Sequence, residues 1–194
     1  GAVPIKTTPT KAGDDLFLMR ASVKEVYDLI DKDMTDAGAL VPWQSEKGTA
    51  NERISKAGVL GIYARVCLAR GGYYLDVDGP PRRENYYKEY YQKALDLTKQ
   101  VMDSGEHGLN PSFEKVFRNY CENVVDTYES IFEVGLFNPE GDSDNTGIVG
   151  TYNSPKVHPD SPYGRANSYM NTTPVFFNKY AEEDVRRDIA IATY

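Results

Sequence analysis

The 194-residue sequence contains few metal-ligating side chains, with only two cysteines and two histidines. Cys67 and Cys121 are far apart and each histidine is isolated, so the spacing forms no zinc motif, and we expect neither a metal nor another cofactor. Cys67 lies on the apolar face of an expected helix, where a cysteine typically acts as a small buried hydrophobe. A disulfide between Cys67 and Cys121 stays possible in an oxidising compartment, although spacing alone does not predict it.

Long apolar runs and excess positive charge are also missing. No stretch approaches the roughly 18 apolar residues of a membrane-spanning helix, and the mean hydropathy is -0.55. The 29 acidic residues outnumber the 22 basic ones, which gives a net charge of -7 that would repel a phosphate backbone. We therefore exclude nucleic acid as a partner. Residues 1–10 lack the features of an export signal, so we expect a removed signal or a start within a longer protein.

The first half of the chain has the periodicity of amphipathic helices. A capping box at Ser22–Glu25 opens a three- and four-residue apolar repeat, which predicts a helix over about 23–40. A second box at Thr49–Glu52 predicts a helix that ends at Gly71 and Gly72. A third apolar stripe predicts a helix from Tyr87 to about Met102.

The second and third of these helices are expected to pair as an antiparallel hairpin with tetratricopeptide-like spacing. The small residues Ala57, Gly58 and Gly61 favour a close helix–helix contact on one face of that hairpin. The connection from Gly72 to Arg83 is longer than a regular repeat allows. A lone hairpin cannot bury both of its faces, so we expect further chain to cover it.

The composition changes in the second half. A short helix is expected between Ser112 and Asn123, followed by a β-prone strand over 130–137. From Asn138 to Thr173, 24 of 36 residues are Gly, Pro, Asn, Asp, Ser or Thr, and no regular period survives. The sequence thus predicts a mainly α protein in two parts, a helical part over 1–137 and a loop-rich part over 138–194.

The long irregular segment is the candidate ligand site. Its tyrosines are interleaved with planar amide and guanidinium side chains, and an aromatic ring can stack on the C–H face of a pyranose while Asn and Arg bind the hydroxyls. The simpler alternative is that these tyrosines only anchor the loop to the helices. The predicted ligand-binding residues are Tyr152, Asn153, Tyr163, Arg165, Asn167 and Tyr169.

Several short segments, in this order, resemble the SusD/RagB family of outer-membrane glycan-binding lipoproteins. They are Val3-Pro-Ile-Lys6, Arg20–Asp33, Ser55–Leu68, Tyr90–Ala94, Glu129–Val134, Phe177–Tyr180 and Asp184–Asp188. The resemblance implies tetratricopeptide-like helix pairs and an outward-facing protein that an N-terminal lipid, absent from this chain, anchors in the outer membrane. It also implies oligosaccharide delivery to a SusC-like TonB-dependent transporter. Family members are more than twice this length, so the chain resembles a middle portion that packs against the remainder of the same protein. No ligand residue transfers by motif.

Three functions from different classes remain open on the sequence. The first is non-catalytic glycan binding, and the second is a protein-interaction module in which the helical hairpin holds a peptide. The third is glycoside hydrolysis, which needs two carboxyl groups about 5 to 9.5 Å apart. Asp142 and Asp144 could equally contact Ca²⁺, but the rest of an EF-hand loop is missing. We expect a binding protein and not an enzyme; the candidate carboxylates for hydrolysis are Glu129, Glu133, Asp142, Asp144, Glu182 and Asp184.

Overall fold

The structure is a computed structural model that describes residues 2–48, 51–75, 79–122, 124–136, 149–158, 160–162, 166–191 and 193. The described chain is helical, with isolated β-bridges and no extended ladder, which confirms the mainly α prediction. It forms two compact units, one of residues 1–108 with 130–133 and the other of residues 109–129 with 134–194. These units are groups of residues that contact one another. The predicted division after residue 137 rests on a change of composition, so it stays a prediction.

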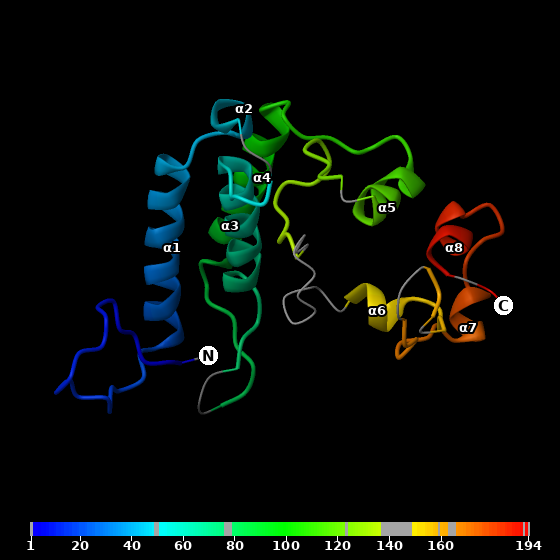
Figure 1. Ribbon diagram of the computed structural model, residues 1–194. Helices are drawn as coiled ribbons and strands as arrows, with labels where there is room; N and C mark the ends of the chain where they lie inside the picture. The colour runs from blue at the N-terminus through cyan, green and yellow to red at the C-terminus, as the bar shows by residue number, and fades with distance from the viewer. Residues whose placement is uncertain are drawn as a thin grey trace. The chain divides into compact units, whose positions relative to one another are not determined.

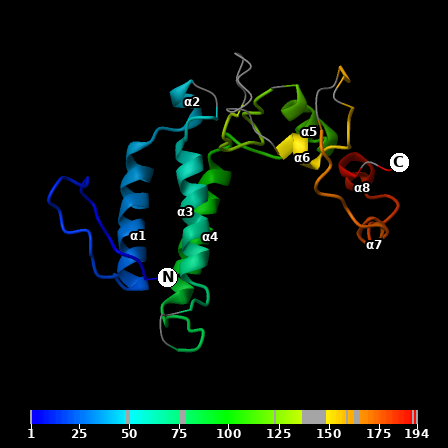
Figure 2. The same ribbon diagram turned by 60° about the horizontal axis from the view of Figure 1, so that its bottom comes forward.

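Among its described residues, the first unit holds four helices. They are α1 (Val23–Leu40), α2 (Gln44–Lys47), α3 (Lys56–Arg70) and α4 (Tyr87–Asp103). Helices α3 and α4 form an antiparallel hairpin, and α1 lies along it (Figures 1 and 2). The hairpin predicted from the apolar stripes is therefore confirmed. None of the described helices is both long and apolar enough to cross a membrane.

Local capping explains where α1 begins. The Ser22 side chain accepts a hydrogen bond from the Glu25 backbone N–H, and the Glu25 carboxylate accepts one from the Ser22 N–H at 2.8 Å. This reciprocal pair satisfies two amides that the helix itself leaves unbonded. At the end of α4, Gly105 has a φ of 70°, which a glycine adopts without steric cost. Both boundaries agree with the sequence prediction.

The second capping box was predicted in the wrong place. Helix α3 begins after Ser55, and residues 51–53 form a turn. Asn51 is fully buried there. Its side-chain amide donates to the Ser130 carbonyl, and its backbone carbonyl accepts a hydrogen bond from the Glu133 N–H. These long-range bonds hold 51–53 outside the helix. They also explain why the predicted strand does not form over described residues 130–136: this segment pairs with a turn instead of a neighbouring strand.

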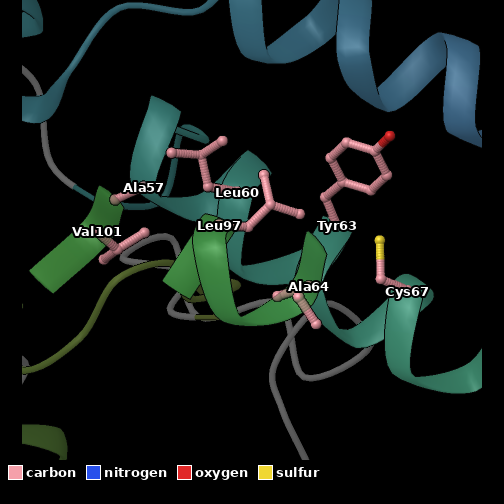
Figure 3. Packing of buried hydrophobic residues seen from close by; sticks show 8 residues of the cluster. Ala57, Leu60, Tyr63, Ala64, Cys67, Leu97 and Val101 are labelled. Atoms are coloured by element: carbon pink, nitrogen blue, oxygen red, sulfur yellow. The ribbon is translucent and has the colours of Figure 1, made fainter. Parts of the chain in front are cut away.

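A small apolar core joins α3 to α4. Tyr63 reaches from this core towards α1, and its hydroxyl lies next to that helix (Figure 3). The thiol of Cys67 is fully buried, as the sequence predicted, and both cysteines are free, so no disulfide links them. The core residues are Ala57, Leu60, Tyr63, Ala64 and Cys67 from α3, with Ala94, Leu97 and Val101 from α4.

The predicted close-packed face is correct for two of its three residues. Ala57 is fully buried, and a Cβ added at Gly58 would lie 2.9 Å from Ile54 and 3.4 Å from Phe132. A Cβ added at Gly61, in contrast, would meet no atom within 4 Å. Ala57 lies in the core shared with α4, whereas the groups nearest to Gly58 are Ile54 and Phe132, neither of which belongs to a helix. The predicted close helix contact is therefore not seen at Gly61.

The part of the second unit that the structure describes contains four short helices. They are α5 (Phe113–Cys121), α6 (Val149–Asn153), α7 (Pro174–Phe177) and α8 (Val185–Ala190), and α5 contacts α8. Helix α5 agrees with the predicted short helix and is capped by the Ser112 hydroxyl, which accepts from the Lys115 N–H. The charge run at 182–188 forms the start of α8, where the Asp184 side chain caps the helix and pairs with Arg186.

Candidate functional site

The structure brings two of the predicted ligand-site tyrosines together in the second unit. The rings of Tyr152 and Tyr169 lie 5.0 Å apart between centroids, with an angle of 58° between their planes. Tyr152 is carried by α6 and is partly buried, while Tyr169 is 67% exposed. The separation is within the range of stabilising aromatic pairs. One ring of the pair is thus displayed to solvent with the other behind it.

Backbone hydrogen bonds fasten the two tyrosine-bearing segments to each other. The Tyr152 carbonyl accepts the N–H groups of Tyr169 at 2.8 Å and of Met170 at 3.3 Å. The Thr151 carbonyl accepts the Asn167 N–H at 2.8 Å. An antiparallel bridge between Val157 and the buried Ala166 closes the same loop. The rings are therefore positioned by main-chain bonds and do not depend on side-chain contact alone.

A special backbone conformation precedes the exposed ring. Ser168 has a φ of 52°, in the left-handed region that residues other than glycine, asparagine and aspartate seldom occupy. Its hydroxyl donates to the Asn171 Oδ1 at 2.7 Å, and the Asn171 amide donates to the Ser168 carbonyl at 3.0 Å. These two bonds hold the turn, and the turn directs the chain so that Tyr169 reaches Tyr152.

The other predicted ligand residues have different placements. Asn153 is exposed at the end of α6 and Asn167 is partly buried next to the paired rings in sequence. Tyr163 and Arg165 lie outside the described residues. The described part of the prediction thus places an exposed aromatic ring and two amide side chains on neighbouring segments, a combination suited to stacking on a sugar and bonding its hydroxyls.

A second polar cluster, in the first unit, was not predicted from the sequence. Arg70, at the end of α3, has a side chain only 5% exposed and donates to Asp28 of α1 at 2.5 Å. Its guanidinium lies 4.3 Å from the ring centroid of Tyr90 and 5.7 Å from those of Tyr27 and Tyr86. Hydrogen bonds from Lys24 and Arg70 hold the pKa of Asp28 below its usual value. The cluster encloses its own charge, so we interpret it as a structural link between α1 and the hairpin.

A related network joins the same three helices one turn further along. The Tyr63 hydroxyl donates to Asp31 at 2.6 Å, and Lys93 of α4 donates to the same carboxylate at 3.0 Å. Burial would raise the pKa of Asp31, but the bonds from Tyr63 and Lys93 outweigh that effect and hold the pKa below its usual value. The clue in the sequence is that charged residues interrupt the apolar stripes of α1 and α4. Only the helix packing shows that they meet.

The described carboxylates considered for hydrolysis differ in their local surroundings. Glu129 accepts the backbone N–H of Asn110 at 2.6 Å, Asp184 caps α8, and Glu182 is exposed. Asp142 and Asp144 lie outside the described residues. Among the residues that the structure describes, no group of three or more His, Cys, Asp or Glu side chains is placed to hold a metal ion.

Comparison with known proteins agrees with the helical architecture. Residues 1–68 match the SusD-like family model whose description is "starch-binding associating with outer membrane". No curated protein matches the sequence. Among solved structures, the fold is similar to that of a SusD homologue from Bacteroides thetaiotaomicron, with a TM-score of 0.60 and 22% identity over 72% of this chain.

The same comparison sets the scale of the chain. It covers 25% of the Bacteroides protein, so it spans about a quarter of the length of that homologue. The match over residues 1–68 includes α1 and most of α3, and it contains three of the segments on which the resemblance rested. The family-model match over residues 1–68 and the similar fold both support the resemblance to the SusD/RagB family.

Proposed function

We propose that this chain is part of a protein that binds a glycan at the bacterial outer membrane without cleaving it, and that the Tyr152–Tyr169 pair belongs to its sugar-contacting surface. The observation that carries the proposal is the exposed Tyr169 ring held by main-chain bonds. An exposed aromatic ring normally costs free energy, because its apolar surface remains in water. A stacked sugar would cover that surface.

The proposal extends to delivery. Within the SusD/RagB family, the binding protein would be lipid-anchored, would face outward and would pass its oligosaccharide to a SusC-like TonB-dependent transporter. The family description of outer-membrane association supports the location. The full protein, purified gently from solubilised outer membranes, should retain such a transporter. Its consistent absence under conditions that preserve other membrane complexes would contradict the delivery role.

Glycan binding is tested by measuring affinities of the full chain for a panel of oligosaccharides, with and without Tyr169→Ala. Tyr73→Ala is the matched control, because Tyr73 is exposed to a similar extent, 70% against 67%, but lies in the first unit. We expect the Tyr169 variant to weaken binding and the Tyr73 variant to leave it unchanged. If both variants weaken binding equally, or if neither does, Tyr169 is not part of the sugar-contacting surface.

The same mixtures test the absence of catalysis. After long incubation with the bound glycans, the distribution of chain lengths should be unchanged, because the proposed protein binds its glycan without cleaving it. Steady turnover by pure protein would favour the hydrolase alternative.

The peptide-binding alternative has an observation of its own. Leu68 of α3 and Leu95 and Met102 of α4 are 53%, 59% and 77% exposed along the hairpin. If a peptide were the ligand, Leu95→Ser would abolish its binding and Tyr169→Ala would not. This opposite pattern separates the two functions.

A further inference from the structure

We infer that the Tyr152–Tyr169 pair provides a single stacking face, on Tyr169, so that it binds one pyranose ring and does not span successive sugars of a chain. This inference rests on the proposed function and adds how many sugar rings the pair contacts. It also assigns different roles to the two tyrosines: Tyr169 is the platform and Tyr152 positions it.

The spacing of the rings excludes a sugar between them. Stacked carbon atoms approach to about 3.5 to 4 Å. A pyranose held between two aromatic rings would therefore require centroids roughly 7 to 8 Å apart, twice that contact distance. The observed 5.0 Å leaves room for ring-to-ring contact only. The tilted rings therefore contact each other and leave no space for a sugar between them.

Exposure and tilt decide which outer face is available. Tyr169 is 67% exposed, whereas Tyr152 is partly buried at α6. The planes differ by 58°, so the rings do not form the coplanar surface on which consecutive sugars of an extended chain would lie. A sugar that stacks on Tyr169 consequently leaves Tyr152 without a partner sugar in the same plane.

The backbone keeps this arrangement in place before a ligand binds. The Tyr152 carbonyl accepts two N–H groups from the Tyr169 segment, and Ser168 supplies the left-handed turn that precedes the ring. Replacing Ser168 with glycine would remove the hydroxyl bond to Asn171 but would keep the left-handed turn accessible, because glycine adopts positive φ freely and the Asn171 amide can still donate to the carbonyl of residue 168. Replacing it with proline would not, because the proline ring fixes φ near -65°.

The experiment compares a short and a long sugar on the same variants of the full chain. Maltose and maltohexaose are the probes, and calorimetry gives the dissociation constants. Tyr169→Ala should weaken both by the same factor, about tenfold, the loss expected from removing roughly 60 Å² of apolar contact. Residues outside the pair can raise the affinity for the longer sugar, but they would raise it equally in the variant.

Variants at the other two positions test the positioning roles. Tyr152→Ala should weaken binding several-fold, because Tyr169 loses the ring that it packs against, and Tyr152→Phe, which keeps that ring, should weaken binding less. Ser168→Pro should weaken binding to the same extent as Tyr169→Ala, and Ser168→Gly should weaken it less. Thermal unfolding of each variant identifies any that fails to fold, and the phenylalanine and glycine variants remain informative in that event.

The outcomes separate the inference from the proposed function. If the unaltered protein binds neither sugar nor any other glycan, the proposed function is wrong and the inference with it. If both sugars bind and Tyr169→Ala weakens maltohexaose at least tenfold more than maltose, the pair spans several sugars and only the inference is wrong. If both bind and Tyr169→Ala changes neither, glycan binding stands and the stacking face lies elsewhere.

Discussion

Two glycine substitutions, Gly61→Ala and Gly71→Ala, should change stability in opposite directions. Gly61 lies in the interior of α3 with nothing within 4 Å of an added Cβ. An alanine there gains helix propensity and creates no clash, so the free energy of unfolding should rise by about 0.8 to 1 kcal/mol. This reverses the expectation from the sequence, which placed Gly61 in a close helix contact.

Gly71 gives the opposite result for an equally local reason. It is the residue that ends α3, and an added Cβ would lie 2.6 Å from the Tyr91 ring and 3.0 Å from the Tyr87 carbonyl oxygen. The ring can shift, but the carbonyl belongs to the first turn of α4 and cannot move without distorting that turn. We expect a loss of about 1 to 3 kcal/mol, the usual cost of overpacking.

Urea unfolding of the full chain, followed by far-ultraviolet circular dichroism, measures both changes in one assay. The Gly61 variant should unfold at higher urea than the parent and the Gly71 variant at lower urea, with similar transition slopes. Destabilisation by Gly61→Ala would show that another part of the protein packs on that face, and would refute the reasoning from local space.

Three further predictions concern the helical unit. Tyr63→Phe should lower the free energy of unfolding by about 1 to 2 kcal/mol in the same urea assay, because it removes a hydrogen bond to a partly buried carboxylate; an unchanged midpoint would show that water replaces that bond. Because the folded-state pKa of Asp31 is lowered, its stabilisation should be complete above the unfolded value of about 3.9 and lost as the pH falls below it. Asp31→Asn should therefore cost stability at pH 7 and progressively less as the pH falls below the unfolded value towards the lowered folded-state pKa, and a difference independent of pH would contradict this. Burial raises the pKa of the Cys67 thiol, so iodoacetamide should label Cys121 in the folded protein and Cys67 only after unfolding, with mass spectrometry of the peptides as the readout.

The resemblance to the SusD/RagB family and the main helices could be predicted from the sequence because their signals are local. The capping box at Ser22 and the glycine after α4 act over three or four residues, so they mean the same thing in any surrounding. The apolar stripe of α4 likewise predicted the helix, although only Ala94 and Val101 of that stripe lie in the core with α3. The burial of Cys67 also agrees with its position on the apolar face of an expected helix.

The tertiary structure decided everything that depended on a distant partner. The amides at the start of α2 are bound by Glu106, more than 60 residues away, and no local pattern predicts that helix. Asn51 donates its side-chain amide to the Ser130 carbonyl and does not take part in a helix cap at the predicted capping box. A buried amide needs a hydrogen-bond partner, and here a distant part of the chain supplies it. In the sequence, Arg70 is only a basic residue near the end of an expected helix. The structure packs Asp28 of α1 and Tyr90 of α4 against its guanidinium group.

The candidate site shows the same division. Composition alone indicated that the segment after residue 137 carries aromatic and amide side chains suited to a sugar. Which tyrosines pair was set by the bonds from the Tyr152 carbonyl and by the left-handed turn at Ser168, neither of which has a period or a motif. The physical reason is that a sequence records the preferences of each residue for its neighbours along the chain, whereas a binding surface is formed by residues that only folding brings together.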